Sequence, residues 1–391
     1  MTRHTQPHDR TRLDDHTRLD DHKSTTLPDG GTTPTDNRRT TSTPAAEDRG
    51  DDPLLVVDDL RTYIDTDGGT IRAVDGVSFA VEPGETVCLV GESGSGKSVT
   101  CESITRIVPQ PPARVVGGSV EFDGMDLLEA DGSMLRTVRG NRIAHVFQNP
   151  QQALDPVYTV GDQIGEAIEI HEDVSDAERR ERGIDLLRKV GIPNAATRID
   201  DYPHEFSGGM AQRAAIAIAL AAEPDLLIAD EPTTAVDVTV QARLIELLQD
   251  LTGEGMALLL VTHDLRVVAA LADRVVSMFG GTVVEKGPTE AVFARPGHPY
   301  TQALFESYDD LERRSDRSAR GDIPTDGCRF REECPYAVDA CASDAQPPFY
   351  SIGGRTDHTG SCVFYGPDRD ASEIVDASET ARPIVRGGDD D

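Results

Sequence analysis

The chain has 391 residues, enough for two or three domains with hydrophobic cores of ordinary size. It carries 70 acidic residues against 38 Lys and Arg residues, a formal net charge of -32 at pH 7, which argues against general nucleic-acid binding. No run of about 18 apolar residues and no apolar signal-peptide core occurs, so we expect neither a membrane span nor export.

Residues 1–52 are predicted to form a disordered polar tail. They contain few large apolar side chains and repeat the sequence Thr-Arg-Leu-Asp-Asp-His. Ordering such a segment would bury too little apolar area to offset the conformational entropy lost. Four histidines lie in this tail, and solvated side chains explain them better than a metal site does: His4, His8, His16 and His22.

The folded part is predicted to begin at Pro53 and to alternate strands with helices. Strand-like apolar runs cover 54–57, 71–81, 87–90, 118–123, 142–147, 226–229 and 257–261. Helix-like stretches cover 99–108, the region near 160–190, and 210–222. An edge hairpin is expected over 275–286, with its turn at Gly280-Gly281. This order predicts an α/β fold with a mostly parallel core sheet flanked by helices.

Residues 91–98 read Gly-Glu-Ser-Gly-Ser-Gly-Lys-Ser directly after an apolar run. This spacing lets backbone N–H groups converge on phosphate oxygens, while Lys97 reaches the terminal phosphates and Ser98 ligates Mg²⁺. A glycine-rich turn is the weaker interpretation, because the pattern lies between a strand and a helix-compatible stretch. The nucleotide-binding residues predicted here are Gly91, Glu92, Ser93, Gly94, Ser95, Gly96, Lys97, Ser98 and Val99.

Two carboxylates, Asp230 and Glu231, follow the apolar strand 226–229. At the end of a strand, Asp230 is suited to act as a partner of Mg²⁺ and Glu231 to polarise an attacking water as general base. Without other signals, a solvated loop start would explain the pair equally well.

Residues 207–213 read Ser-Gly-Gly-Met-Ala-Gln-Arg and open an Ala-rich helix, whose positive dipole end can face an anion. Here the chain resembles the ATP-binding cassette (ABC) family, whose signature begins with the equivalents of Ser207, Gly208 and Gly209. The resemblance implies a cassette with an antiparallel β subdomain and a helical subdomain over about 150–222. It also implies that this signature faces ATP held by the phosphate loop of another subunit, in a dimer.

The resemblance assigns four further residues, each of which would be unremarkable alone. Gln148 is similar to the Q-loop glutamine that contacts Mg²⁺ and water, and His263 is similar to the switch histidine at the γ-phosphate. Asp237 corresponds to the D-loop at the dimer interface. Tyr63 corresponds to the aromatic residue that stacks on adenine, although an ordinary core tyrosine is an alternative.

Longer stretches resemble the ATPases of dipeptide and oligopeptide importers, and most closely their D-type subunit. They are 146–150, 154–161, 207–210 and 231–242. Nickel and other small-solute importers are very similar at these positions, so the substrate stays open. The resemblance implies ATP and Mg²⁺ as ligands, an F-type ATPase or a second copy as dimer partner, two membrane permeases, an extracellular solute-binding protein, and a place on the cytoplasmic face of the membrane.

The C-terminal part supports this subfamily. Residues 297–304 read Gly-His-Pro-Tyr-Thr-Gln-Ala-Leu, similar to the start of its C-terminal extension. Four cysteines follow, with gaps that do not match the paired motifs of common zinc ribbons. Some relatives carry a [4Fe–4S] cluster here, and the hypothesis is that the same four ligate one, with zinc-bound or unligated thiols as alternatives: Cys328, Cys334, Cys341 and Cys362.

The predicted organisation is a tail over 1–52, a cassette over 53–296, an irregular extension over 297–366 and an acidic tail over 367–391. The predicted function is ATP hydrolysis that energises peptide uptake; a soluble ABC ATPase and a non-hydrolysing regulatory subunit are the alternatives. The chain has only four lysines, and this Lys-poor, acidic composition resembles proteins of salt-accumulating halophiles.

Overall fold

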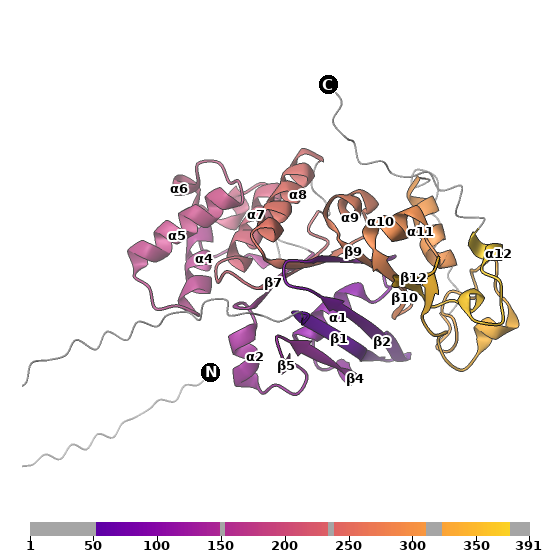
Figure 1. The fold of residues 1–391 in the computed structure, drawn as a ribbon. Coiled ribbons are helices and arrows are strands. Elements are labelled where there is room, and N and C mark those ends of the chain that lie inside the picture. Colours follow the sequence, from indigo (N-terminus) through magenta and orange to yellow (C-terminus); the bar gives the residue numbers. More distant parts are fainter. Residues whose placement is uncertain (1–51, 149–152, 234–237, 310–322, 376–391) are drawn as a thin grey trace, which may run out of the picture. The chain divides into compact units, whose positions relative to one another are not determined.

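A computed structural model describes residues 52–148, 153–233, 238–309 and 323–375 (Figure 1). Both predicted tails lie outside this part, except for Asp52 and residues 367–375. The described elements form two sheets with helices packed on them.

The smaller sheet is antiparallel, as the resemblance implied, and has the strand order β2-β1-β4-β5. Its long strands β1 and β2 pair along nearly their whole length, so that Arg61 lies opposite Asp75 and Tyr63 opposite Arg72. The four strands are β1 (Leu55–Thr66), β2 (Gly69–Val81), β4 (Ala113–Phe122) and β5 (Met125–Asp126).

The larger sheet has the order β11-β12-β10-β9-β3-β8-β7-β6, and its strands from β9 to β6 are parallel, as predicted. Strand β3 is buried at all five positions, since Cys88 and Val90 face one core and Val87 and Leu89 the other. The strands of the parallel part are β3 (Thr86–Val90), β6 (Ile143–Val146), β7 (Leu226–Asp230), β8 (Ala257–Thr262) and β9 (Arg274–Phe279).

The predicted hairpin forms from β9 and β10 (Thr282–Pro288), with Gly280 and Gly281 at positive φ in its turn. The prediction that this hairpin forms the edge of the sheet was wrong. Strand β10 also pairs with β12 (Arg355–Gly360), which in turn pairs with β11 (Tyr350–Ile352). Two strands of the C-terminal extension therefore cover the edge that the local pattern alone would leave open.

Four of the helices differ from their predicted bounds, including α7, which covers Gly208–Ala219 instead of 210–222. The first is α1 (Lys97–Ile104), which ends earlier than predicted. The region near 160–190 contains two helices, α4 (Val160–Glu169) and α5 (Asp176–Lys189), because Thr159 and Ser175 each cap a new N-terminus. The other helices are α2 (Gly132–Val138), α6 (Ala195–Arg198), α8 (Val238–Gly253), α9 (Leu265–Leu271), α10 (Thr289–Ala294), α11 (Pro299–Asp309) and α12 (Ser372–Val375).

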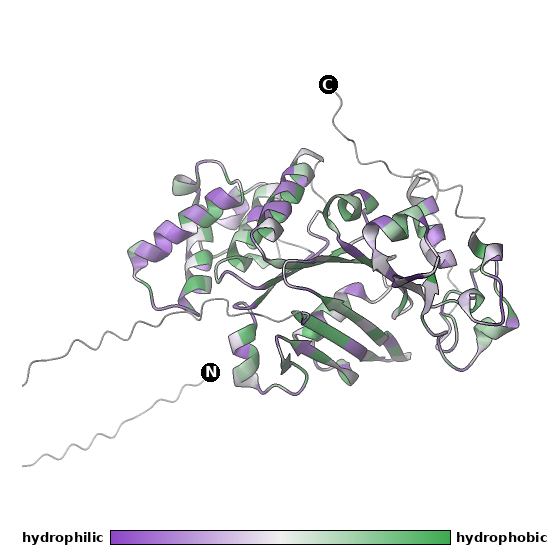
Figure 2. Cartoon of the chain, viewed as in Figure 1, coloured by the Kyte–Doolittle hydropathy of each residue, from purple (hydrophilic) through white to green (hydrophobic). Residues whose placement is uncertain are grey.

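Helices α4 to α7 pack on one another and form the helical region that carries the signature. Figure 2 shows mainly green, hydrophobic strands in the sheets and a largely purple, hydrophilic α5. Among the helices of the described part, none is long and apolar enough to cross a bilayer.

Candidate active site

The predicted site residues follow the carboxyl ends of four adjacent parallel strands. The phosphate loop follows β3, His263 follows β8, Asp230 and Glu231 lie at the end of β7, and Gln148 lies just beyond β6. These strands are neighbours in the order β3-β8-β7-β6. Because parallel strands end at the same edge of a sheet, the topology gathers residues that are far apart in the sequence.

The phosphate loop is shaped by glycines that no other residue could replace without a shift of the backbone. A Cβ atom on Gly91 would collide with the carbonyl oxygen of Met278, and one on Gly96 with that of Ala73. Gly96 has a φ of 100° and precedes α1, which has neither a side-chain cap nor an acidic residue in its first turn. The positive end of α1 is thus left for an anion.

Lys97 lies within this loop and is only 5% exposed. Its Nζ donates to the carbonyl oxygens of Gly91 at 2.8 Å and Glu92 at 2.9 Å, and to Ser95 Oγ at 3.3 Å. Burial lowers the pKa of Lys97, while the negative charges of Glu231 and Asp230 oppose this shift. The loop therefore holds a largely desolvated ammonium, which binds an incoming anion more strongly than a solvated one would.

Ser98 and Asp230 meet beside the loop and fit a magnesium ion. Burial raises the pKa of Asp230, while the neighbouring Ser98 hydroxyl opposes this shift. Among the described residues, the buried Oδ1 of Asp230 has no hydrogen-bond partner. An orphaned carboxylate oxygen beside a hydroxyl is the donor set that Mg²⁺ takes together with phosphate oxygens.

Glu231 is held by two of the other predicted residues. Gln148 Nε2 donates to its Oε2 at 2.8 Å, and His263 Nδ1 lies 3.2 Å from its Oε1. The backbone of Glu231 has a φ of 47°, a left-handed conformation that costs about 1–3 kcal/mol in a non-glycine residue. Its side chain is 15% exposed and that of His263 is 58% exposed, so this part of the site opens to solvent.

Tyr63 lies on β1 and is bonded to Asp75 rather than packed as an ordinary core tyrosine. Its hydroxyl donates to Asp75 Oδ1 at 2.8 Å, and the guanidinium of Arg72 lies 5.7 Å from its ring centroid. The ring is half-buried.

The signature lies at the start of α7. Ser207 caps the helix by accepting from the N–H of Met210 at 3.3 Å, and Ser207 and Gly208 are exposed. Arg213 is largely buried, and its guanidinium donates to the carbonyl oxygens of Gly209 and Gly191. The exposed N-terminus of α7 can therefore face a second molecule. Asp237 lies outside the described residues.

The four C-terminal cysteines are free thiols. Burial raises the pKa of Cys328 to about 11 and that of Cys362 to about 12, and the neighbouring thiols add to both shifts. In the part of the chain that the structure describes, no three His, Cys, Asp or Glu side chains are placed to hold one metal ion. The thiols are therefore near one another without forming a finished single-ion site.

One residue at the phosphate loop was missed in the sequence. Tyr300 of α11 is almost fully buried, and its hydroxyl accepts a hydrogen bond from the N–H of Glu92 at 2.8 Å. Phe279 and Phe330 hold its ring, with centroids 4.7 and 5.5 Å away. The tyrosine belongs to the stretch 297–304, which, from the sequence alone, indicates only the subfamily. No local signal in that stretch indicates a contact with the phosphate loop.

This fold and this site define an ABC-type ATPase. Residues 74–234 match the family model described as "ABC transporter", and residues 284–341 match that of the "Oligopeptide/dipeptide transporter, C-terminal region". A solved dimer of the ATP-binding cassette MJ0796, in a post-hydrolysis state bound to ADP and Pi, superposes with a TM-score of 0.55 at 27% identity, over 60% of this chain and 99% of that one.

Curated relatives narrow the class. The "Probable peptide ABC transporter ATP-binding protein" of Sinorhizobium fredii is 49% identical over 301 residues, which are 74% of this chain and 89% of that protein. A Brucella abortus relative with a similar name is 48% identical over 311 residues, 78% of this chain and 93% of that protein. The chain therefore belongs to the family of peptide ABC transporter ATP-binding proteins.

Proposed function

We propose that this chain is the D-type ATPase of an importer that takes up dipeptides or oligopeptides. The contact of Gln148 and His263 with Glu231, beside a loop suited to phosphate and a carboxylate suited to Mg²⁺, is the observation that carries the ATP hydrolysis in this proposal. The names of the relatives and the match of 284–341 to the peptide-transporter C-terminal region support peptide as the substrate class.

In the proposed reaction, Lys97 and the amides of residues 91–99 would hold the phosphates, and Ser98, Asp230 and Gln148 would hold Mg²⁺. The metal neutralises phosphate charge when it is bound. Glu231 accepts the proton of the attacking water, and Gln148 and His263 fix the direction of its carboxylate. His263 also contacts the γ-phosphate, and Tyr63 stacks on adenine.

The exposed signature supports a composite site, in which Ser207, Gly208 and Gly209 face ATP on a second ATPase and Asp237 lies near the interface. Peptide importer ATPases dimerise and work with membrane permeases. We propose an F-type ATPase as the partner, or a second copy, together with two permeases and a solute-binding protein, at the cytoplasmic face of the membrane.

Reconstitution tests the proposed function. In proteoliposomes, the chain with two permeases, a partner ATPase and a binding protein should take up labelled dipeptide or oligopeptide only with MgATP. Uptake of nickel but no peptide would assign the chain to the alternative substrate class. ATPase activity indifferent to permeases would favour a soluble role.

We further propose the boundaries 53–296 for the cassette and 297–366 for the extension. The two family matches, 74–234 and 284–341, support a division into two regions, although the second match already begins in β10, before residue 297.

We also propose a high-salt cellular environment for this protein. A net charge of -32 implies that the chain repels itself and that salt screens this repulsion, since the Debye length falls from about 10 Å at 0.1 M to about 3 Å at 1 M. The unfolding temperature should therefore rise steadily between 0.1 and about 2 M KCl, and a flat or falling curve would contradict the halophilic origin.

The four cysteines are proposed to ligate a [4Fe–4S] cluster. The nearness of the four thiols supports this proposal: besides burial, neighbouring thiols raise the pKa of Cys328 and Cys362, and a bound cation that displaces their protons would remove that repulsion. A cluster also spans more space than a single ion, so thiols too far apart to share one ion can still hold it.

Iron analysis of anaerobically purified protein tests the cluster. We expect iron and acid-labile sulfide in equal amounts, with visible absorbance from sulfur-to-iron charge transfer. Cys334→Ser should lose both. The matched control Cys101→Ala, which changes a buried thiol on α1, should keep both. Iron-free protein, or zinc in its place, would rule the cluster out.

A further inference from the structure

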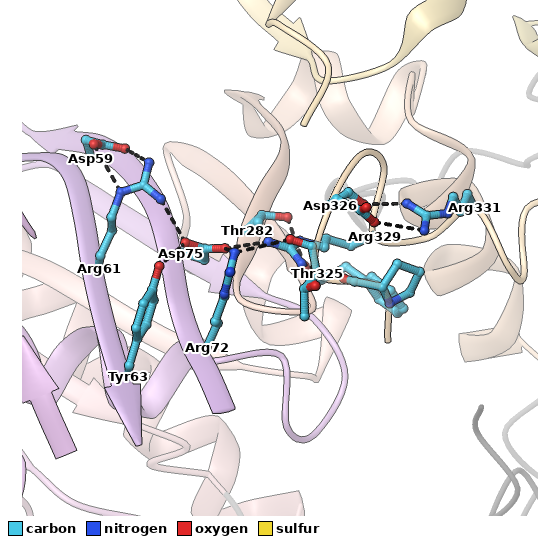
Figure 3. A network of polar contacts seen from close by, with 12 residues as sticks. Asp59, Arg61, Tyr63, Arg72, Asp75, Thr282, Thr325, Asp326, Arg329 and Arg331 are labelled. Atoms are coloured by element: carbon cyan, nitrogen blue, oxygen red, sulfur yellow. Dashed lines mark hydrogen bonds and ion pairs between the residues drawn. The ribbon is translucent and has the colours of Figure 1, made fainter. Parts of the chain in front are cut away.

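The part of the site that carries Tyr63 is bonded to a distant segment of the chain. We call residues 323–366 the cysteine segment. Figure 3 shows the carboxylate of Asp75 on β2, which accepts from Arg61 Nη1 at 2.8 Å, from the Tyr63 hydroxyl at 2.8 Å, and from Nη2 of Arg329. Arg329 belongs to the cysteine segment, 254 positions after Asp75. One carboxylate thus joins Tyr63 to that segment.

Arg329 is the buried partner of this carboxylate. The side chains of Arg329 and Asp75 are 6% and 4% exposed, whereas those of Arg61 and Arg72 are 37% and 44% exposed. Exposed ion pairs contribute little because water and salt screen them, and buried pairs are screened much less. Loss of Arg329 would leave Asp75 with partners that solvent weakens.

The Tyr63 ring is held at two points by this network. Its hydroxyl is anchored on Asp75, and the guanidinium of Arg72 lies over its ring, directly across the β1–β2 ladder. Arg72 also donates to the carbonyl oxygen of Thr325 at 3.3 Å, a second bond to the cysteine segment. A ring fixed before it meets a planar ligand loses less freedom on binding.

We propose that Arg329 is a positioning residue for purine binding, which acts through Asp75 to fix the Tyr63 ring on which adenine stacks. The inference rests on the proposed role of Tyr63. It makes the cysteine segment a part of the nucleotide site, so that any change that displaces Arg329 weakens ATP binding.

The phosphate loop is connected to the same strand without the side chain of Arg329. Gly281 N donates to Ser95 O at 3.0 Å, and Asp75 N donates to Gly281 O at 2.8 Å. The stem carbons of Arg329 lie against Gly280, and a methionine would keep such a stem. Removal of the guanidinium alone should therefore spare the binding of the phosphates.

Binding of ATP and of inorganic tripolyphosphate separates these two effects. For Arg329→Met we expect the Kd for ATP to rise roughly three- to tenfold, less than the loss expected for a whole stacked ring, with the Kd for tripolyphosphate unchanged. Arg329→Lys should restore part of the affinity. Arg331→Met is the matched control, because Arg331 pairs only with Asp326 and Glu332 among the described residues, inside the cysteine segment.

Tyr63→Phe provides a second variant that removes only the hydroxyl bond to Asp75. It should raise the Kd for ATP, and its effect should not add to that of Arg329→Met. Equal weakening of both ligands by Arg329→Met would mean a general structural role and overturn the inference. If Tyr63→Ala weakens ATP binding but Arg329→Met and Tyr63→Phe do not, the inference fails alone. If Tyr63→Ala has no effect, the proposed role of Tyr63 fails with it.

Discussion

Glu231→Gln should abolish ATP turnover while ATP binding persists. The amide keeps the size of the side chain and an oxygen that can accept from Gln148, but it cannot take a proton from water. Removal of a general base typically costs about 10²- to 10⁴-fold in rate. Phosphate release at saturating MgATP, measured beside the Kd for ATP, should therefore show a fall in kcat of at least about a hundredfold with little change in Kd.

The exposed glutamate Glu254 gives the control for this prediction. It pairs with Lys189 on the surface, and Glu254→Gln should leave both kcat and Kd unchanged. His263→Ala removes one of the two contacts that orient Glu231 and should lower kcat by a smaller factor. Turnover of Glu231→Gln at the normal rate would mean that another group accepts the proton, and it would remove the chemical reason for the strained backbone at this position.

The edge of the sheet that carries the site could be predicted because its residues follow strand-like runs, either directly or after the short phosphate loop. Lys97, Asp230 and His263 come after continuous apolar runs, and strands of that kind are parallel and buried on both faces. Their order along the edge needs only the topology of the sheet. The contacts of Glu231 with Gln148 and His263 then follow from strand neighbourhood.

The contacts of the C-terminal part could not be predicted, because they join segments with no local signal for each other. The bond of Tyr300 to Glu92 spans 208 positions and that of Arg329 to Asp75 spans 254. The pairing of β12 with β10 could not be predicted for the same reason. The six residues of β12 have an ordinary composition, and nothing in them indicates that Gly360 pairs with Glu285, far earlier in the chain. The helix α8 is absent from the predicted elements, although its sequence contains a signal for it. Four leucines recur at helical spacing and are buried: Leu244, Leu247, Leu248 and Leu251.

Lys97→Met should lose nucleotide binding itself, in contrast to Glu231→Gln. The ammonium of Lys97 is buried among the loop's own carbonyl oxygens, and phosphate oxygens would replace those acceptors as stronger, charged partners. Methionine fills the same space without a charge. We expect the Kd for ATP to rise roughly a hundredfold or more. The substitution removes a charge-assisted hydrogen bond from a desolvated site, and this bond would hold the phosphates, the most highly charged part of ATP. Titration with ATP and with tripolyphosphate measures the change in Kd.

Because the chain has only four lysines, Lys189→Met is a close control for this substitution. Lys189 is 42% exposed and pairs with Glu254, so its loss should change neither ligand's Kd. Both ATP and tripolyphosphate should bind more weakly to Lys97→Met, since this residue contacts phosphate and not the purine. That pattern differs from the one expected for Arg329→Met, which weakens ATP alone. If Lys97→Met instead binds ATP normally, the phosphates lie elsewhere, and residues 91–98 are only a glycine-rich turn between β3 and α1.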